Sequence, residues 1–128
     1  MDAGLPQSAT DRAEASLRRG DTLCGEERYA DAIACYEQAI QLAPDHAEAY
    51  FSIAHAFFML NAYERAVAPL RQAIALSPRS YRYHLHLGMA LQMLRRHDEA
   101  EGSFLRAIGL NPREGIAHHC LGMFYEDW

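Results

Sequence analysis

The chain has 128 residues, half of them apolar, which is enough for one continuous hydrophobic core but not for two separate ones. Its net charge is −5 and its basic residues form no stripe that could neutralise phosphates, so the composition argues against a nucleic-acid partner. No apolar run is long enough to cross a membrane, and the first ten residues have neither the basic start nor the apolar centre of a signal peptide, so we expect a cytoplasmic protein.

Two residue types narrow the class of protein further. The three cysteines, Cys24, Cys35 and Cys120, form an odd set without CxxC spacing, which favours reduced thiols over a disulfide framework or a zinc site. All twelve basic residues are arginine, an indication of a GC-rich, bacterial genome.

No nucleophile elbow, phosphate loop or catalytic carboxylate pair is present, so we predict no enzyme activity, no catalytic residues and no cofactor.

The chain is expected to begin with a flexible leader over residues 1–9, where Gly4, Pro6 and Ser8 indicate irregular structure. A first helix is predicted from about Asp11 to Gly25, with Ser8 or Thr10 as its N-cap. A second helix follows from about Tyr29 to Leu42. The first helix carries polar residues where later helices carry apolar ones, which is typical of a polar capping helix.

The central stretch, residues 47–80, predicts two amphipathic helices that face each other. Apolar and small side chains recur at i, i+3, i+4 and i+7 in both halves. They are Tyr50, Ile53, Ala54 and Phe57, then Ala66, Leu70, Ala73 and Ile74. Pro78 ends the second helix, and Pro69 inside it predicts either a bend or a late helix start.

The same pattern recurs every 34 residues. Three apolar residues of the second helix, and the proline that follows it, appear three times. They are Ala32, Tyr36, Ala39 and Pro44; Ala66, Leu70, Ala73 and Pro78; and Ala100, Phe104, Ala107 and Pro112. A small residue of the first helix appears four times, as Gly20, Ala54, Gly88 and Gly122. A fixed period of this length indicates stacked supersecondary units.

The final stretch, residues 115–128, repeats only the first helix of a unit and is apolar almost all round, which predicts burial on more than one side. One stripe is expected to pack on the preceding unit. The other, with Leu121, Tyr125 and Trp128, would lie against another subunit or another domain, or form a frayed end with an exposed aromatic patch.

These spacings resemble the tetratricopeptide repeat (TPR) family. The resemblance implies an all-α fold, a right-handed α-solenoid of stacked antiparallel helix pairs, in a single domain over residues 10–128. Three units would span residues 13–46, 47–80 and 81–114, and a partial fourth would span 115–128.

Resemblance to the family also implies that the first helices line a concave groove for a peptide. The groove positions that we select fall on all four units. They are Leu17 and Arg18 in the first unit; Phe51, His55, Phe58 and Met59 in the second; Arg82, Leu85, His86, Met89 and Met93 in the third; and His119 and Met123 in the fourth. Because most are apolar, we expect a groove for a segment with apolar anchors, although some of these side chains could be ordinary core.

Several ligands are disfavoured by the groove residues. Some TPR domains hold a C-terminal carboxylate with Lys and Asn, but at the matching positions here Asp21 repels an anion and Leu17 cannot contribute. Arg82 and Arg18 remain candidates for single contacts with an acidic residue of a ligand. Only His55 and His86 could approach each other among seven histidines, so no metal site is expected.

The third unit also resembles TPR chaperones of type III secretion translocators, through Pro78–Arg79, Tyr81, Tyr83, His84 and Ala100–Glu101–Gly102.

The sequence therefore predicts a non-enzymatic interaction module that binds an apolar protein or peptide segment in its concave groove. The alternative is a self-assembling or excised scaffold domain of a larger protein that makes its main contact through the unpaired last helix. A type III secretion-type chaperone is a variant of the first hypothesis.

Overall fold

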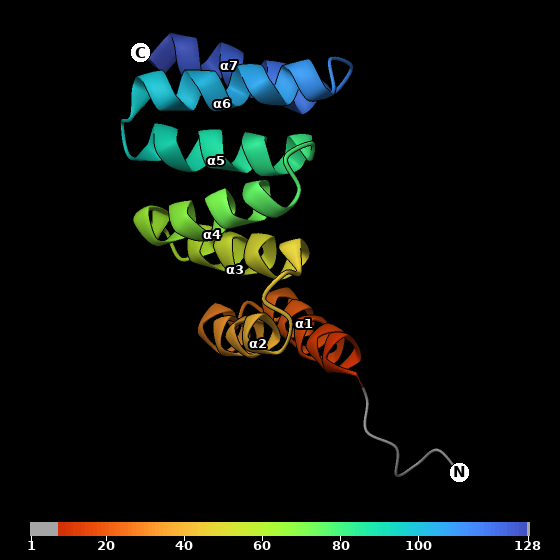
Figure 1. Cartoon of the computed structure of the whole chain (residues 1–128). Coiled ribbons are helices and arrows are strands. Elements are labelled where there is room, and N and C mark those ends of the chain that lie inside the picture. The colour runs from red at the N-terminus through yellow and green to blue at the C-terminus, as the bar shows by residue number, and fades with distance from the viewer. Residues whose placement is uncertain (1–7, 128) are drawn as a thin grey trace, which may run out of the picture.

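The computed structural model describes residues 8–127 and contains, in that range, seven α-helices and no strand. Figure 1 shows the helices stacked in chain order from the N-terminal pair to the last helix. Their bounds are α1 Ala9–Gly25, α2 Tyr29–Leu42, α3 Ala47–Met59, α4 Tyr63–Leu76, α5 Tyr81–Met93, α6 His97–Leu110 and α7 Gly115–Asp127. Each helix packs most extensively on its neighbours in the chain. The predicted all-α solenoid of helix pairs, followed by a lone final helix, is confirmed.

The first helix begins two residues earlier than the sequence predicts. Ser8 is its N-cap, and the Ser8 hydroxyl oxygen accepts a hydrogen bond from the Asp11 backbone N–H at 3.0 Å. Such a cap stabilises a helix by about 1 kcal/mol. Ser8 and Ala9 therefore belong to the helix start, not to the leader, and the rest of the expected leader, residues 1–7, lies outside the described residues.

The turn between the two helices of a pair has the same backbone geometry in all three pairs. Glu27, Asn61 and Arg95 adopt φ of 62°, 61° and 61°, and each follows the C-cap of a first helix. In the first turn the Arg28 N–H donates to the Leu23 carbonyl oxygen at 2.8 Å, and the Glu27 N–H donates to that of Cys24 at 2.9 Å. This is the Schellman arrangement, which usually has glycine at the left-handed position.

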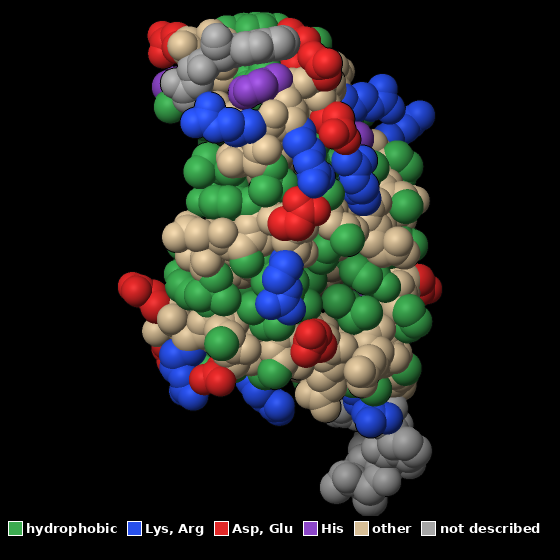
Figure 2. All heavy atoms as spheres, turned by 90° about the vertical axis from the view of Figure 1, so that its left-hand side faces the viewer, with side chains coloured by type: hydrophobic (Ala, Val, Ile, Leu, Met, Phe, Trp, Pro, Cys, Tyr) green, Lys and Arg blue, Asp and Glu red, His purple; other side chains and the backbone are tan. Residues whose placement is uncertain are grey.

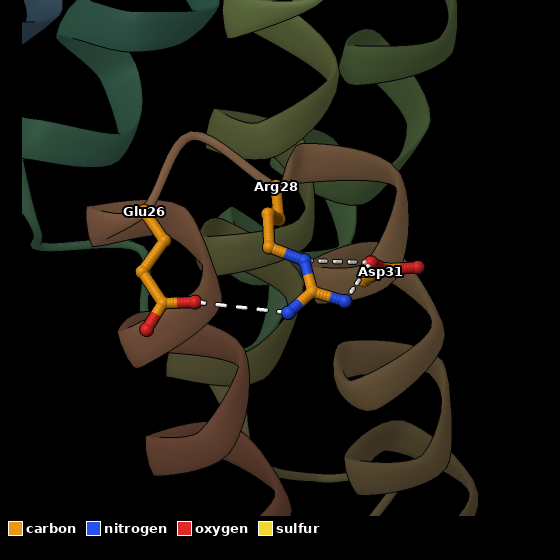
Figure 3. Close-up of polar contacts among 3 residues, drawn as sticks. All are labelled: Glu26, Arg28 and Asp31. Carbon is orange, nitrogen blue, oxygen red and sulfur yellow. Dashed lines mark hydrogen bonds and ion pairs between the residues drawn. The ribbon is translucent and has the colours of Figure 1, made fainter.

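An arginine spans the first of these turns. Figure 3 shows the Arg28 guanidinium between two carboxylates, with Nη2 2.7 Å from Asp31 Oδ2 and Nη1 3.8 Å from Glu26 Oε1. All three side chains are more than half exposed, so the ion pairs contribute at most about 1 kcal/mol. Backbone hydrogen bonds therefore fix this turn more than the charges do.

Small residues of the first helices let aromatic rings of the second helices come close. A Cβ built on Gly20 would lie 2.5 Å from the ring of Tyr36, and one built on Gly88 would lie 2.8 Å from that of Phe104. Both rings are fully buried. The repeated glycine is therefore a packing residue that sets how closely the two helices of a pair approach.

Successive units are tied by one side-chain donor at an equivalent position. Hydrogen bonds run from Tyr50 to the carbonyl oxygen of Pro44 at 2.8 Å, from His84 to that of Pro78 at 3.0 Å and from His118 to that of Pro112 at 2.8 Å. Each of these prolines lies one residue beyond the C-cap of a second helix. Each new first helix thus bonds to the turn that precedes it, and in both histidines the Nε2 atom must carry the proton.

Pro69 lies inside α4, which runs without interruption from Tyr63 to Leu76. The late helix start that the sequence offered as one possibility is therefore wrong. The missing N–H removes one backbone hydrogen bond, and the buried side chains of Ala66, Leu70 and Ala73 hold the helix against its neighbours.

Across residues 8–127, no helix has both the length and the apolar character needed to span a membrane.

Candidate groove along the first helices

The first helices lie on the inner side of the stack. α1 approaches α3, and α5 approaches α7, whereas no two second helices come as close to each other. On this side a hollow of about 320 Å³ opens between the first three units. Its walls come mainly from three first helices, with Tyr36 of α2 at the base. The lining residues are Asp21, Cys24, Tyr36, Glu48, Phe51, Ser52, His55, Arg82 and His86.

Two tyrosine hydroxyls fix the two carboxylates of the hollow. The Tyr36 hydroxyl donates to Asp21 Oδ1 at 2.7 Å, and the Tyr83 hydroxyl donates to Glu48 Oε1 at 3.1 Å. Burial, more than the neighbouring carboxylate, raises the pKa of Tyr83 to about 12. Burial is also the main reason why the pKa of Tyr36 is raised, followed by its contacts with Cys24 and Asp21. Both tyrosines therefore stay protonated and act as donors.

An aromatic cluster forms the floor beside these carboxylates. The ring of Phe51 lies 5.0 Å from that of Tyr83 and 4.8 Å, edge-on, from that of His86, centroid to centroid. The Arg82 guanidinium carbon lies 4.8 Å from the Phe51 centroid, a cation–π distance. Residues of α3 and α5 thus close the hollow from below while Arg82 remains exposed at its rim.

His86 is held as a neutral ring. Its Nδ1 donates to the Arg82 carbonyl oxygen at 2.9 Å, which leaves Nε2 as an acceptor. Burial lowers the pKa of His86. The hydrogen bond to the Arg82 carbonyl oxygen opposes this shift in part, and the charges of His55 and Arg82 add to it. The His55 and His86 rings lie 6.4 Å apart, centroid to centroid, so the two histidines do approach each other as the sequence suggested.

Only part of the predicted groove set gathers in this hollow. Phe51, His55, Arg82 and His86 line it, and Phe58 lies next to it, against the ring of Tyr63. Leu17, Phe51 and Leu85 are buried and belong to the core. These three side chains are therefore ordinary core, the alternative that the sequence left open for some groove positions, and the ring of Phe51 packs on those of Tyr83 and His86 of α5.

The predicted methionines lie away from the hollow. Met59 and Met93 end α3 and α5 and are about half exposed, Met123 of α7 is similarly exposed, and Met89 is half-buried. Met93 lines a second hollow, of about 300 Å³, beside His97 and Phe124. Figure 2 views the side where α3 meets α4 and α5 meets α6, and it shows hydrophobic side chains in patches between charged ones.

The remaining predicted residues lie at the two ends of the stack. Arg18 and His119 are exposed and do not line the hollow. On α7, Leu121 is half-buried against the core, whereas Tyr125 is half exposed and its hydroxyl donates to Glu101. Trp128 lies outside the described residues.

Two tyrosines that shape the hollow were not among the predicted site residues. Tyr36 was assigned to the packing set, and Tyr83 was noted only for its aromatic ring. The usable signal is that a buried tyrosine hydroxyl needs a hydrogen-bond partner, and Asp21 and Glu48 are within reach on neighbouring first helices.

No three His, Cys, Asp or Glu side chains within the described range lie close enough to share a metal ion. The hollow therefore offers carboxylates, an arginine, a neutral histidine and an aromatic floor, a set that can form hydrogen bonds and ion pairs with a ligand.

Comparisons with known proteins agree on one architecture. A family profile described as "Tetratricopeptide repeat" matches residues 17–80 and 61–114. No curated protein matches the sequence.

Many solved structures match, and three illustrate the likeness. The first TPR of Spaghetti (RPAP3), bound to the HSP90 peptide SRMEEVD, has a TM-score of 0.89 and 22% identity, over 92% of this chain and 94% of that one. The second TPR domain of human RPAP3, with the HSP70 peptide SGPTIEEVD, has a TM-score of 0.89 and 25% identity, over 92% and 98%. MamA has a TM-score of 0.85 and 28% identity, over 90% of this chain and 67% of that one.

Proposed function

Because this chain belongs to the tetratricopeptide repeat family, we propose that it is a protein-interaction module that binds a peptide or protein segment along the first helices. The observation that carries the proposal is the hollow of about 320 Å³, to which α1, α3 and α5 all contribute side chains. Two similar solved structures contain chaperone peptides, which supports a peptide as the ligand here as well.

The segment is expected to contact both a polar and an apolar part of this surface. The hollow presents charged and hydrogen-bonding groups, and the half-exposed side chains of Met59, Met93 and Met123 present flexible apolar area on α3, α5 and α7. Methionine adapts its shape to varied apolar partners. A ligand with apolar anchors therefore remains our proposal, with a polar contact in the hollow added.

The proposal is tested by selection from a displayed random dodecapeptide library. Selected peptides should bind the natural chain and fail to bind His55→Trp, because the larger ring would occupy the hollow that His55 lines. The matched control is Leu105→Trp, at a side chain of α6 that is about half exposed, away from the first helices. Equal binding to both variants, with unchanged helicity, would remove the hollow from the binding site.

A second candidate function, self-association through α7, is favoured by one observation. Gly122 corresponds to Gly20 and Gly88 in the repeat, yet among the described residues nothing beyond the adjoining backbone of α7 lies within 4 Å of a Cβ built there, whereas rings cover the other two. Around this open position, Ile116, Met123 and Tyr125 are each about half exposed.

Light scattering at micromolar concentration tests this candidate. A self-associating chain should scatter as a dimer or larger species, and Tyr125→Ser combined with Trp128→Asp should return it to the monomer mass. A natural chain that is monomeric throughout the concentration range would exclude the candidate.

A further inference from the structure

We infer that the hollow between α1, α3 and α5 takes a positively charged side chain, so that the bound segment carries an arginine or lysine beside its apolar anchors. The inference rests on the proposed function, because it names the chemistry of a ligand bound in the same groove.

The hollow is small. Its volume of about 320 Å³ lies at the small end of the range for ligand pockets, which is roughly 300–1,000 Å³. A segment that follows the first helices can therefore place one long side chain in the hollow while the rest of it contacts the surrounding surface.

Two carboxylates on different helices have acceptor capacity left for that side chain. Asp21 of α1 and Glu48 of α3 each accept one tyrosine hydroxyl, through Oδ1 and Oε1 respectively. The second oxygen of each carboxylate has no hydrogen bond to any part of the chain that the structure describes. The tyrosines hold both carboxylates in place, and preorganised acceptors bind a cation without the cost of ordering them.

The cations nearby do not neutralise these carboxylates. The Arg82 guanidinium lies over the ring of Phe51, and among residues 8–127 no ion pair joins it to Asp21 or Glu48. Burial of His86 disfavours its charged form. Two negative charges therefore face one exposed positive charge at the rim.

The surroundings reinforce the preference for a cation. The first 46 residues, which include α1 and α2, carry nine Asp or Glu against four Arg. A surface of one sign raises the local concentration of ligands of the opposite sign. Acidic peptides without a basic residue, such as SGPTIEEVD, found on the second TPR domain of human RPAP3, would meet the carboxylate of Asp21 in this groove and be repelled.

The test uses matched synthetic peptides and fluorescence anisotropy. Each capped heptapeptide contains two leucines and one arginine, separated by one to four residues across the series, and each has a twin with citrulline, which keeps the shape of arginine but lacks its charge. At least one arginine peptide should bind about tenfold more tightly than its twin at 50 mM salt, the gain expected of a charge-assisted hydrogen bond. The preference should shrink at 500 mM salt.

Matched variants test whether the preference for arginine arises in the hollow. Asp21→Asn with Glu48→Gln should abolish the preference for arginine, since the amide oxygens can still accept the tyrosine hydroxyls and the fold is kept. Glu37→Gln, which removes one negative charge from an exposed site on α2 outside the hollow, should leave the preference unchanged.

The outcomes separate this inference from the function on which it rests. Equal binding of the arginine and citrulline twins, or tighter binding of SGPTIEEVD, which has no basic residue, would overturn the inference while peptide binding in the groove stands. A preference for arginine that survives in the double variant would overturn it too. Absence of binding by every peptide would count against both.

Discussion

The ring of Phe104 lies so close to Gly88 that a Cβ added at Gly88 would come within 2.8 Å of the ring. Phe104 is fully buried and belongs to the second helix of the pair, so it cannot move aside without opening the core. We predict that Gly88→Ala lowers the free energy of unfolding by about 1–3 kcal/mol, the usual cost of overpacking, measured by urea denaturation.

Gly102→Ala is the matched control for this change. Gly102 lies in the interior of α6, and a Cβ built there meets nothing within 4 Å. Alanine is the better helix former, so this variant should gain about 0.5–1 kcal/mol. If both variants shifted stability in the same direction, close packing at Gly88 would not explain the recurring glycine.

The strained turn between α1 and α2 gives a second prediction. Glu27 has a φ of 62°, a conformation that costs an L-residue about 1–2 kcal/mol and glycine much less. Glu27→Gly should therefore raise the thermal midpoint, and Glu27→Val should lower it. Thermal denaturation followed by circular dichroism measures both, and a loss of stability in Glu27→Gly would show that the backbone of this turn carries no strain.

Much of the fold could be predicted from the sequence because its determinants are local and repeated. Proline and capping residues predicted where helices end, and α2 begins at Tyr29 and ends at Leu42 as expected. The conformation of the turns between helices could not be predicted in this way. Nothing in the residue types of Glu27 or Arg95 indicates a left-handed conformation, because the surrounding helices impose it. Equally, buried contacts along α4 outweigh the preference of Pro69 to end a helix.

The site was only partly predictable, because periodicity gives the face of a helix but not how tightly neighbouring faces close. Phe51 and Leu85 occupy groove positions, yet both are buried, Phe51 against rings of α5. The polar character of the hollow depends on Tyr83 of one unit reaching Glu48 of the unit before it, over 35 residues of sequence. A reading of each unit by itself could not find that contact.

His86 makes the stability of the fold depend on pH. Burial lowers its pKa in the folded chain, while the unfolded chain keeps an ordinary value of about 6.5. Between these two values the unfolded state binds more protons than the folded state, so stability falls as the pH is lowered through about 6.5. We expect the urea midpoint to fall between pH 7.5 and 5.5.

The variant His86→Gln isolates this contribution, since glutamine can donate a hydrogen bond but does not titrate. Its urea midpoint should fall less steeply over the same pH range than that of the natural chain. His84→Gln is the control, at a histidine that bonds the Pro78 carbonyl oxygen instead of facing the hollow. A pH dependence that is unchanged in His86→Gln would mean that the ring is not held neutral by its surroundings.

The groove itself is tested most directly by a two-dimensional ¹H–¹⁵N NMR titration of the labelled chain with the tightest of the arginine peptides. The account predicts that the backbone signals that shift most belong to α1, α3 and α5, with Asp21, Ser52 and His86 among them. Shifts confined to α2, α4 and α6, or spread evenly over the chain, would contradict a binding site on the first helices.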